Sequence, residues 1–404
     1  MASLKLNGVN KVFPSGSLAL YDVNLEAKDK EFLVVLGGEA SGKSTMLRVI
    51  AGLEEATSGE IFIDGKDMTD VDPKDRNIAM VFRGGTLYPA LNVYENMAFG
   101  LKLRKASPAL IEQRVKAAAN ILGLNDVLYR KPKTLSAAQK QRVSVARAIV
   151  REPAVYLFDE PLAGLDDNLK GELLNIIINL QARMEGTFVY ATKSVAEALT
   201  IGTRIIVIKN GIIQQIDSPF NLYDYPANAY VAFMVGAPSI NFINNAKIVK
   251  DGEGVFAVDG EFKIPVAESV LKRFEKLDEY ANTEKKVIVG IRPEDILAGE
   301  EGFEAVTEKV ENDGDSYFAE CALFGHDLVV TCNEKTVKDA KTKLKIDSQR
   351  LYIFDAETRL TLLNRDEGYQ NTGFAEADYV PPSFAEEENI IKKFKPEKPS
   401  KKKR

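Results

Sequence analysis

A glycine-rich loop that ends in a lysine and a hydroxyl carries the clearest chemistry in this sequence. Residues 37–44 read Gly-Gly-Glu-Ala-Ser-Gly-Lys-Ser, which fits the pattern G-x-x-x-x-G-K-[ST]. The apolar run 32–36 precedes the loop, and residues 45–51 carry apolar side chains at helical spacing. Strand, glycine loop and helix in this order are the context that a polyphosphate-binding loop requires. A chance glycine turn is the alternative, and both flanking elements argue against it.

The residue types of the loop indicate what it would bind. Its backbone N–H groups and the N-terminus of the following helix would point at an anion. Lys43 would reach the outer phosphates of a nucleotide, and the Ser44 hydroxyl would ligate Mg²⁺. We therefore expect nucleotide binding by a run of consecutive residues: Gly37, Gly38, Glu39, Ala40, Ser41, Gly42, Lys43, Ser44 and Thr45.

Two adjacent carboxylates follow another apolar run. Residues 155–158 read Val-Tyr-Leu-Phe, and Asp159 and Glu160 come next. In a phosphate-loop domain, an acid at such a strand end holds Mg²⁺, and a neighbouring group can orient or activate the attacking water. We therefore expect Asp159 to hold the metal and Glu160 to act as the general base. An Asp-Glu pair alone is a weak signal, but together with the loop it is a strong one.

The rest of the chain predicts the elements that position these groups. Short apolar runs alternate with longer helical patterns, which predicts an α/β phosphate-loop domain over residues 1–236, with a mostly helical subdomain at about 88–152. The expected strands are 32–36, 78–82, 155–158, 187–190 and 205–208, and the expected helices are 108–122, 138–151 and 169–184.

The pattern changes after Gly236-Ala-Pro-Ser239. Short alternating runs at 254–258, 287–291, 317–323, 328–332 and 351–354 predict a small β-barrel or sandwich over residues 240–365. From residue 366 the sequence is polar, first acidic and then basic, so we expect a disordered tail over 366–404.

Composition narrows the class of partner. The formal net charge is -6, which gives no electrostatic support for nucleic-acid binding. The longest apolar runs are too short to span a membrane, and the N-terminus lacks a signal-peptide pattern. The chain has one histidine, His326.

At this point the sequence resembles the ATP-binding cassette (ABC) ATPases, specifically those of carbohydrate importers such as the maltose and glycerol-phosphate systems. The resemblance extends to about residue 365. Within it, Gly290-Ile-Arg-Pro-Glu294 and 351–357 are similar to the family's C-terminal OB-type regulatory domain. The segments that match the cassette are 79–82, 87–89, 93–102, 141–143, 146–149 and 157–166.

The resemblance implies a site, cofactors and partners. It implies ATP and Mg²⁺, hydrolysis coupled to transport, and a place for Phe13 against adenine, although an aromatic there could equally pack on the sheet. It also implies two cassettes that sandwich ATP head to tail. The partners would be a second ATPase chain, two permease subunits that dock near residues 87–92, and indirectly a solute-binding protein. The chain would lie on the cytoplasmic face of the membrane.

The departures from the family pattern gather around one reaction centre. Arg83 stands where the family has a glutamine, and arginine has donors but no acceptor for Mg²⁺. Lys193 stands where the family has its switch histidine, and the distant His326 cannot replace it. The family signature Leu-Ser-Gly-Gly-Gln is replaced by Leu-Ser-Ala-Ala-Gln, in which the residues expected to act on the partner's site are Ser136, Ala137, Ala138 and Gln139.

These departures favour an ATP-binding subunit with impaired hydrolysis over a working ATPase that tolerates unusual residues. A heterodimer with an intact ATPase is favoured, because a homodimer, which is possible, would carry every change in both sites. The alternative function is an ATP-sensing regulatory cassette without a transport role. A soluble phosphate-loop kinase or stand-alone cassette is a third hypothesis, which the match at 139–142 and the C-terminal barrel disfavour.

Overall fold

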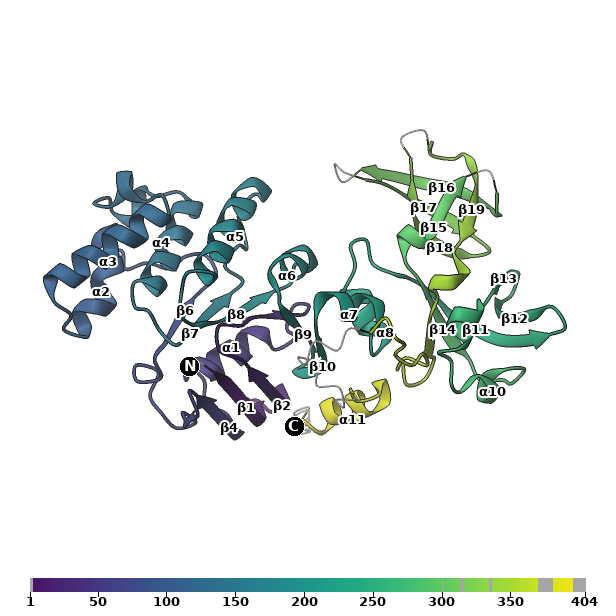
Figure 1. The fold of residues 1–404 in the computed structure, drawn as a ribbon, viewed down its shortest axis with the longest axis horizontal. Helices are drawn as coiled ribbons and strands as arrows, with labels where there is room; N and C mark the ends of the chain where they lie inside the picture. The colour runs from purple at the N-terminus through teal and green to yellow at the C-terminus, as the bar shows by residue number, and fades with distance from the viewer. Residues whose placement is uncertain (1–2, 300, 313–315, 334–335, 370–380, 395–404) are drawn as a thin grey trace, which may run out of the picture. The chain divides into compact units, whose positions relative to one another are not determined.

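The computed structural model describes residues 3–299, 301–312, 316–333, 336–369 and 381–394. The chain divides into two compact units, each described here by itself (Figure 1). The first unit comprises Met1–Ile213 with Ile391–Arg404, and the second comprises Gln214–Ile390. The domain limits at residues 236 and 240 stay predictions.

Five strands of a six-stranded sheet form the centre of the first unit. The order is β10-β9-β3-β8-β7-β6, and the chain division at Ile213 falls within the edge strand β10. Neighbouring strands from β9 to β6 are parallel, and every residue of β3, β7 and β8 is buried. Parallel strands covered on both faces read as continuous apolar runs, which is why the sequence predicted these strands correctly. The bounds are β3 (Phe32–Leu36), β6 (Ile78–Val81), β7 (Val155–Asp159), β8 (Thr187–Thr192), β9 (Arg204–Lys209) and β10 (Ile212–Asp217).

The parallel arrangement decides where the candidate residues lie. The carboxyl ends of parallel strands meet at one edge of the sheet, so the segments that follow β3, β6, β7 and β8 are neighbours there. The glycine loop follows β3, Arg83 lies just past β6, and Lys193 follows β8. Asp159 and Glu160 lie at the end of β7.

A second, antiparallel sheet in the first unit has the order β2-β1-β4-β5. The sequence analysis did not identify it, because its strands bury alternate residues and carry no continuous apolar run. Its bounds are β1 (Leu4–Val12), β2 (Leu18–Ala27), β4 (Ser58–Ile63) and β5 (Lys66–Asp67).

The helices of the first unit other than α1, which follows Gly42, begin at side chains that cap them. Asn92 and Ser136 each form a capping box with the residue three positions on, and Ser107 accepts from the backbone N–H of Leu110. The expected helices are confirmed as α3, α4 and α5. In Figure 1, α2, α3 and α4 lie together beside the sheets. The bounds are α1 (Lys43–Ala51), α2 (Val93–Leu103), α3 (Pro108–Ile121), α4 (Ala137–Ile149), α5 (Asp167–Gln181) and α6 (Val195–Ile201).

The second unit contains a five-stranded sheet, β13-β12-β11-β14-β20, and a closed five-stranded barrel, β15-β18-β17-β16-β19. The barrel confirms the expected all-β character. The bounds are β11 (Asn241–Asp251), β12 (Gly254–Asp259), β13 (Phe262–Pro265), β14 (Val287–Ile291), β15 (Ile296–Gly299), β16 (Phe303–Asn312), β17 (Tyr317–Leu323), β18 (His326–Cys332), β19 (Lys341–Ile346) and β20 (Tyr352–Asp355). The helices of this unit include α7 (Pro219–Asp224), α8 (Ala229–Met234), α9 (Glu268–Leu271) and α10 (Leu277–Tyr280).

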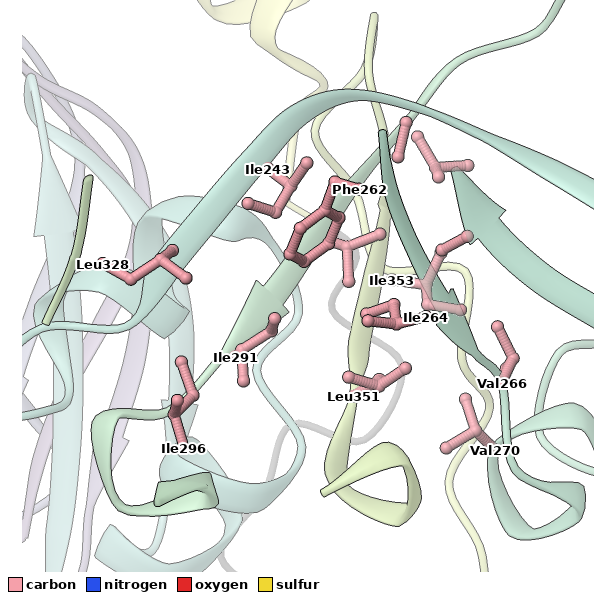
Figure 2. Close-up of a cluster of buried hydrophobic side chains, with 14 of the residues drawn as sticks. Ile243, Phe262, Ile264, Val266, Val270, Ile291, Ile296, Leu328, Leu351 and Ile353 are labelled. Atoms are coloured by element: carbon pink, nitrogen blue, oxygen red, sulfur yellow. The ribbon is translucent and has the colours of Figure 1, made fainter. Parts of the chain in front are cut away.

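One apolar cluster joins the two β-structures of the second unit. Figure 2 shows Ile243, Phe262 and Ile353 of the sheet close to one another, with Ile291 at the end of β14 and Ile296 at the start of the barrel. All five are buried, with at most 1% of their surface exposed. The sheet and the barrel therefore share a core.

The structure differs in two segments from the disordered tail expected over 366–404. Within 366–369, the Tyr369 hydroxyl donates to Oδ2 of Asp217 at 2.9 Å. The other segment is helix α11 (Phe384–Lys393), where the Glu387 side chain is buried and the Arg359 guanidinium lies 4.3 Å from the centre of the Phe384 ring. A polar average composition concealed these few apolar residues at helical spacing. Residues 370–380 and 395–404, including the terminal Lys-Lys-Lys-Arg, lie outside the described residues.

Candidate nucleotide site

The glycine loop needs glycine at two of its positions. Gly42 has a φ of 105°, and a Cβ there would lie 2.6 Å from the carbonyl oxygen of Ala19. A Cβ at Gly37 would lie 2.5 Å from the carbonyl oxygen of Ile208. The close packing of the loop against neighbouring backbone therefore excludes larger residues at both positions.

Lys43 lies beneath the loop and closes it. Its ammonium donates to the carbonyl oxygens of Gly37 at 2.8 Å and Gly38 at 2.6 Å, and the residue is 4% exposed. Nζ also lies 3.8 Å from Oε1 of Glu160. Burial lowers the pKa of Lys43, while the carboxylates of Glu160 and Asp159 act in the opposite direction. The ammonium is thus a buried cation at the base of the cradle, where the pattern places the phosphate-binding lysine.

Ser44 and Asp159 form a pair that fits a divalent cation. The Ser44 hydroxyl donates to Oδ1 of Asp159 at 2.7 Å, and Asp159 is 6% exposed. Oxygen ligands from one hydroxyl and one carboxylate suit Mg²⁺, which usually completes its shell with phosphates and water. Within the described residues, no group of three or more acidic, histidine or cysteine side chains has the geometry of an all-protein metal cage.

Glu160 turns back toward the loop at the end of β7. Its φ is 44°, and its backbone N–H donates to the carbonyl oxygen of Ala191 at 3.0 Å. Its two carboxylate oxygens lie near two cations, Lys43 at 3.8 Å and Arg83 at 3.5 Å. The candidate base is therefore beside the phosphate loop and is also contacted by Arg83.

These groups line one cleft of about 670 Å³, a volume in the range of small-molecule and cofactor sites. Phe13 lies at one side of the cleft, and the Lys11 ammonium is 5.0 Å from the centre of its ring. Arg48, which the sequence analysis did not select, also lines it. A basic residue one turn into α1 carries no motif signal, so only the fold identifies it.

The segment that carries Arg83 is held against α4. Gly85 has a φ of 59°, and a Cβ there would lie 2.7 Å from the carbonyl carbon of Lys140. The Gln141 side-chain amide donates to the carbonyl oxygen of Phe82 at 3.4 Å. The Arg83 side chain itself is 64% exposed and extends from this anchored turn to Glu160.

Lys193 contacts the glycine loop by an ion pair with Glu39. Its Nζ lies 3.0 Å from Oε1 of Glu39, and the Lys193 and Glu39 side chains are 50% and 83% exposed. The Lys193 ammonium lowers the pKa of the Glu39 carboxyl, first by its hydrogen bond and then by its charge. Two of the departures from the family pattern, Arg83 and Lys193, thus each pair with a carboxylate at the candidate site.

Ser136, Ala137, Ala138 and Gln139 do not line this cleft. Ser136 and Gln139 instead cap α4 reciprocally, with bonds of 3.2 and 3.0 Å. Ala138 is only 8% exposed, whereas Ala137 is exposed. Of the two alanines, only Ala137 is exposed.

A second cleft of about 780 Å³ lies between the sheet edge and the helices of the first unit. Tyr88 lines it, with its ring 4.6 Å from that of Phe99 and 5.3 Å from the Arg147 guanidinium. Leu103 also lines it and is 69% exposed. Of the segment 87–92 named in the sequence analysis, Tyr88 alone is among the lining residues.

Comparison with known proteins gives the family. A family model described as "ABC transporter" matches residues 20–163, and one described as "MalK OB fold domain" matches residues 236–296. The chain is similar to a trehalose/maltose import ATP-binding protein, MalK, of Thermococcus litoralis, with 41% identity over 89% of this chain and 99% of the relative. It is also similar to an oligosaccharides import ATP-binding protein, MsmX, of Bacillus subtilis, with 46% identity over 73% of this chain and 79% of the relative.

Solved structures agree with this relationship. A bacterial ABC transporter cassette, MJ0796, described as a dimeric structure, matches 53% of this chain and 98% of its own, with 31% identity and a TM-score of 0.50. CbiO1 of Clostridium perfringens, described as part of an ABC transporter complex, matches 55% and 90%, with 28% identity and a TM-score of 0.51. Together with the phosphate loop and the barrel, these findings show that the chain belongs to the ATP-binding cassette transporter ATPases and carries a MalK-type OB domain.

Proposed function

We propose that this chain is the energy-coupling subunit of a carbohydrate importer, that it holds Mg-ATP in the 670 Å³ cleft, and that its own hydrolysis is impaired. Support for the transported class comes from the two import ATPases, one named for oligosaccharides and one for trehalose and maltose. Glycerol-phosphate-type solutes are the other class that the sequence resemblance implies.

Each group in the cleft has a task that its geometry supports. The loop amides and the buried Lys43 ammonium hold the phosphates, and Phe13 packs against the base. Ser44 and Asp159, 2.7 Å apart, would hold the Mg²⁺ ion, which would neutralise phosphate charge when bound. Glu160 is the side chain that accepts a proton from the attacking water.

The observation that carries the impairment is the contact between Arg83 and Glu160, at 3.5 Å. A guanidinium offers donors only, so it cannot accept from a water or ligate Mg²⁺ as a glutamine oxygen does. The guanidinium also occupies one side of the carboxylate that would accept the proton of the attacking water. Loss of a single preorganised group typically lowers the rate by about 10²–10³.

The signature residues support assembly with a second cassette. Ser136 and Ala137 are exposed and lie outside the chain's own cleft, so they are available to a site on another chain. In a homodimer each site would combine Arg83 and Lys193 with Ala137. We favour a heterodimer with an intact ATPase, because each site would then carry only part of these changes.

Membrane attachment would follow from permease subunits on the cytoplasmic face. No helix in the described part of the chain is long and apolar enough to cross a bilayer. The 780 Å³ cleft, with the exposed Tyr88 and Leu103, suits the insertion of a short helix from a permease. A solute-binding protein would act on the permeases from the other side of the membrane.

ATP turnover of the purified chain, alone and then mixed with candidate partner ATPases, tests the proposal. We expect turnover well below the 1–10 s⁻¹ that is ordinary for enzymes, and a large increase with an intact partner. Ordinary turnover by the chain alone, abolished by Glu160→Gln, would contradict the impairment. Co-purification with permease subunits separates the importer subunit from an ATP-sensing regulator.

A further inference from the structure

Glu39 is a carboxylate inside a loop that is built to bind anions. It is the third residue of the loop and carries the only acidic side chain among residues 37–45. The Lys193 ammonium lies 3.0 Å from its Oε1, and the charges of Arg83 and Lys43 also lower the pKa of its carboxyl. Three cations thus act on one carboxylate, which is the environment that a phosphate group requires.

Three cations near the loop, Lys43, Arg83 and Lys193, each lie beside a carboxylate. Lys193 pairs with Glu39, whereas Arg83 and Lys43 both contact Glu160. Asp159 has a separate partner in Ser44. A phosphate that enters must compete with carboxylates for these cations. Asp159 and Glu160 have roles in metal binding and water activation, but Glu39 has neither.

We propose that the Glu39 carboxylate is an internal competitor of the terminal phosphate: it holds the Lys193 ammonium until a nucleoside triphosphate displaces it, and so sets the selectivity between tri- and diphosphates. The inference rests on the proposed function of residues 37–45 as the ATP-binding loop.

The position of the pair explains why the third phosphate should be affected. Lys43 closes the floor of the loop and is 4% exposed, whereas the Glu39 side chain is 83% exposed at its outer side. The loop amides hold the inner phosphates, and Lys43 reaches the outer ones from the floor of the loop. A diphosphate satisfies these groups without reaching Lys193, but a triphosphate extends toward it.

Equilibrium binding of Mg-ATP and Mg-ADP to the full chain with Glu39→Gln tests the inference. Exposed ion pairs are weak, so we expect ATP to bind about two- to fivefold more tightly and ADP to change by less than about 1.5-fold. Glu185→Gln is the matched control. This variant removes the Lys30–Glu185 ion pair, which has similar exposure (52% and 87%) and an N–O separation of 3.3 Å. Glu185 precedes β8, whereas Lys193 follows β8 at the edge of the sheet that carries the nucleotide site. This control should change neither affinity.

A second comparison uses Lys193→Gln. With no ammonium to release, the gain from Glu39→Gln should disappear in that background. A gain of equal size in both backgrounds would mean that Glu39 only repels phosphate and does not hold Lys193, which overturns the inference. Equal gains for ATP and ADP, or weaker ATP binding by Glu39→Gln, would overturn it too.

Lys43→Ala separates this inference from the proposed function. Loss of ATP binding in that variant, with no effect of Glu39→Gln, would reject the role of Glu39 and leave the site in place. Retained ATP affinity in Lys43→Ala would instead reject the loop as the nucleotide site, and with it the proposed function.

Discussion

Nη1 of Arg83 lies 3.5 Å from Oε2 of Glu160, although 77 positions separate the two residues in the sequence. The contact arises because β6 and β7 are parallel neighbours, so the residues after their carboxyl ends meet. A donor-only side chain therefore contacts the proposed general base. The rate of hydrolysis should depend on both residues together.

Arg83→Gln should raise ATP turnover of the chain, and Arg83→Gln with Lys193→His should raise it by more than the two single effects combined. Both positions act on the same terminal phosphate, and groups that act as one catalytic unit are not additive. We expect about tenfold or more for the double variant, measured as phosphate release under saturating Mg-ATP. Glu160→Gln added to the double variant should remove the gain.

Two results would contradict this prediction. If the effects of the two single substitutions are additive, Arg83 and Lys193 act independently on hydrolysis. If the gain in turnover survives Glu160→Gln, Glu160 is not the general base. Ala137→Gly is a useful comparison, because it is exposed and does not line this cleft. Its effect should appear only when a second cassette is present.

Asp159→Asn should weaken the contribution of Mg²⁺ to ATP binding and leave metal-free binding nearly unchanged. The carboxylate bonded to Ser44 at 2.7 Å is the charged ligand in the proposed metal pair, whereas the loop amides act on the phosphates directly. Titration of ATP with Mg²⁺ and with EDTA measures the difference. If Mg²⁺ strengthens ATP binding in this variant as much as in the parent, then Asp159 is not a ligand of the metal.

Much of this site could be predicted from the sequence because its groups follow buried parallel strands. The apolar runs that become β3 and β7 end directly at the loop and at Asp159. The strand that positions each motif can therefore be recognised from the residues next to it. The Glu39–Lys193 pair could not be predicted in this way. It joins residues 154 positions apart and depends on which strands are neighbours and on side-chain conformations.

The fold also contains elements that the sequence predicted and elements that it did not. Continuous apolar runs identified five strands of the central sheet, and the edge strand β10 was missed. The antiparallel sheet was missed too, because β1 and β2 bury alternate residues and pair through irregular registers. Helix α11 was missed because its apolar residues are few within a polar segment. Tertiary packing, which the local sequence does not record, decided the antiparallel sheet and α11.

Membrane association in cells that contain the permease subunits should depend on Tyr88 and not on Leu91. Tyr88 lines the 780 Å³ cleft and is 44% exposed, whereas Leu91, three residues away, does not line it. Tyr88→Glu should release most of the chain from membranes, because a charge at an apolar contact loses its solvation. Leu91→Ala is the matched control, and cell fractionation measures both.

Deletion of residues 395–404 tests the alternative attachment through the basic C-terminal residues. The deleted chain should remain largely on membranes when the permeases are present. Release by this deletion, with retention of Tyr88→Glu, would make the terminal lysines the anchor and would remove the main physical support for docking through the cleft.

Asp295→Asn should stabilise the second unit at neutral pH and have less effect at pH 4. Burial raises the pKa of Asp295 to about 6, and the Arg350 guanidinium, 3.4 Å away, opposes this shift. A carboxyl with a raised pKa in the folded state contributes its stability fully below the unfolded value, near pH 4. That contribution is lost as the pH rises through about 6.

The asparagine variant does not titrate, so its free energy of unfolding relative to the parent should rise between about pH 4 and 6, by at most about 3 kcal/mol, and then level off. Lost attraction to Arg350 reduces this gain. Urea unfolding at pH 4, 6 and 8 measures it, and a constant difference across the three pH values would show that the ionisation of Asp295 costs the folded state nothing.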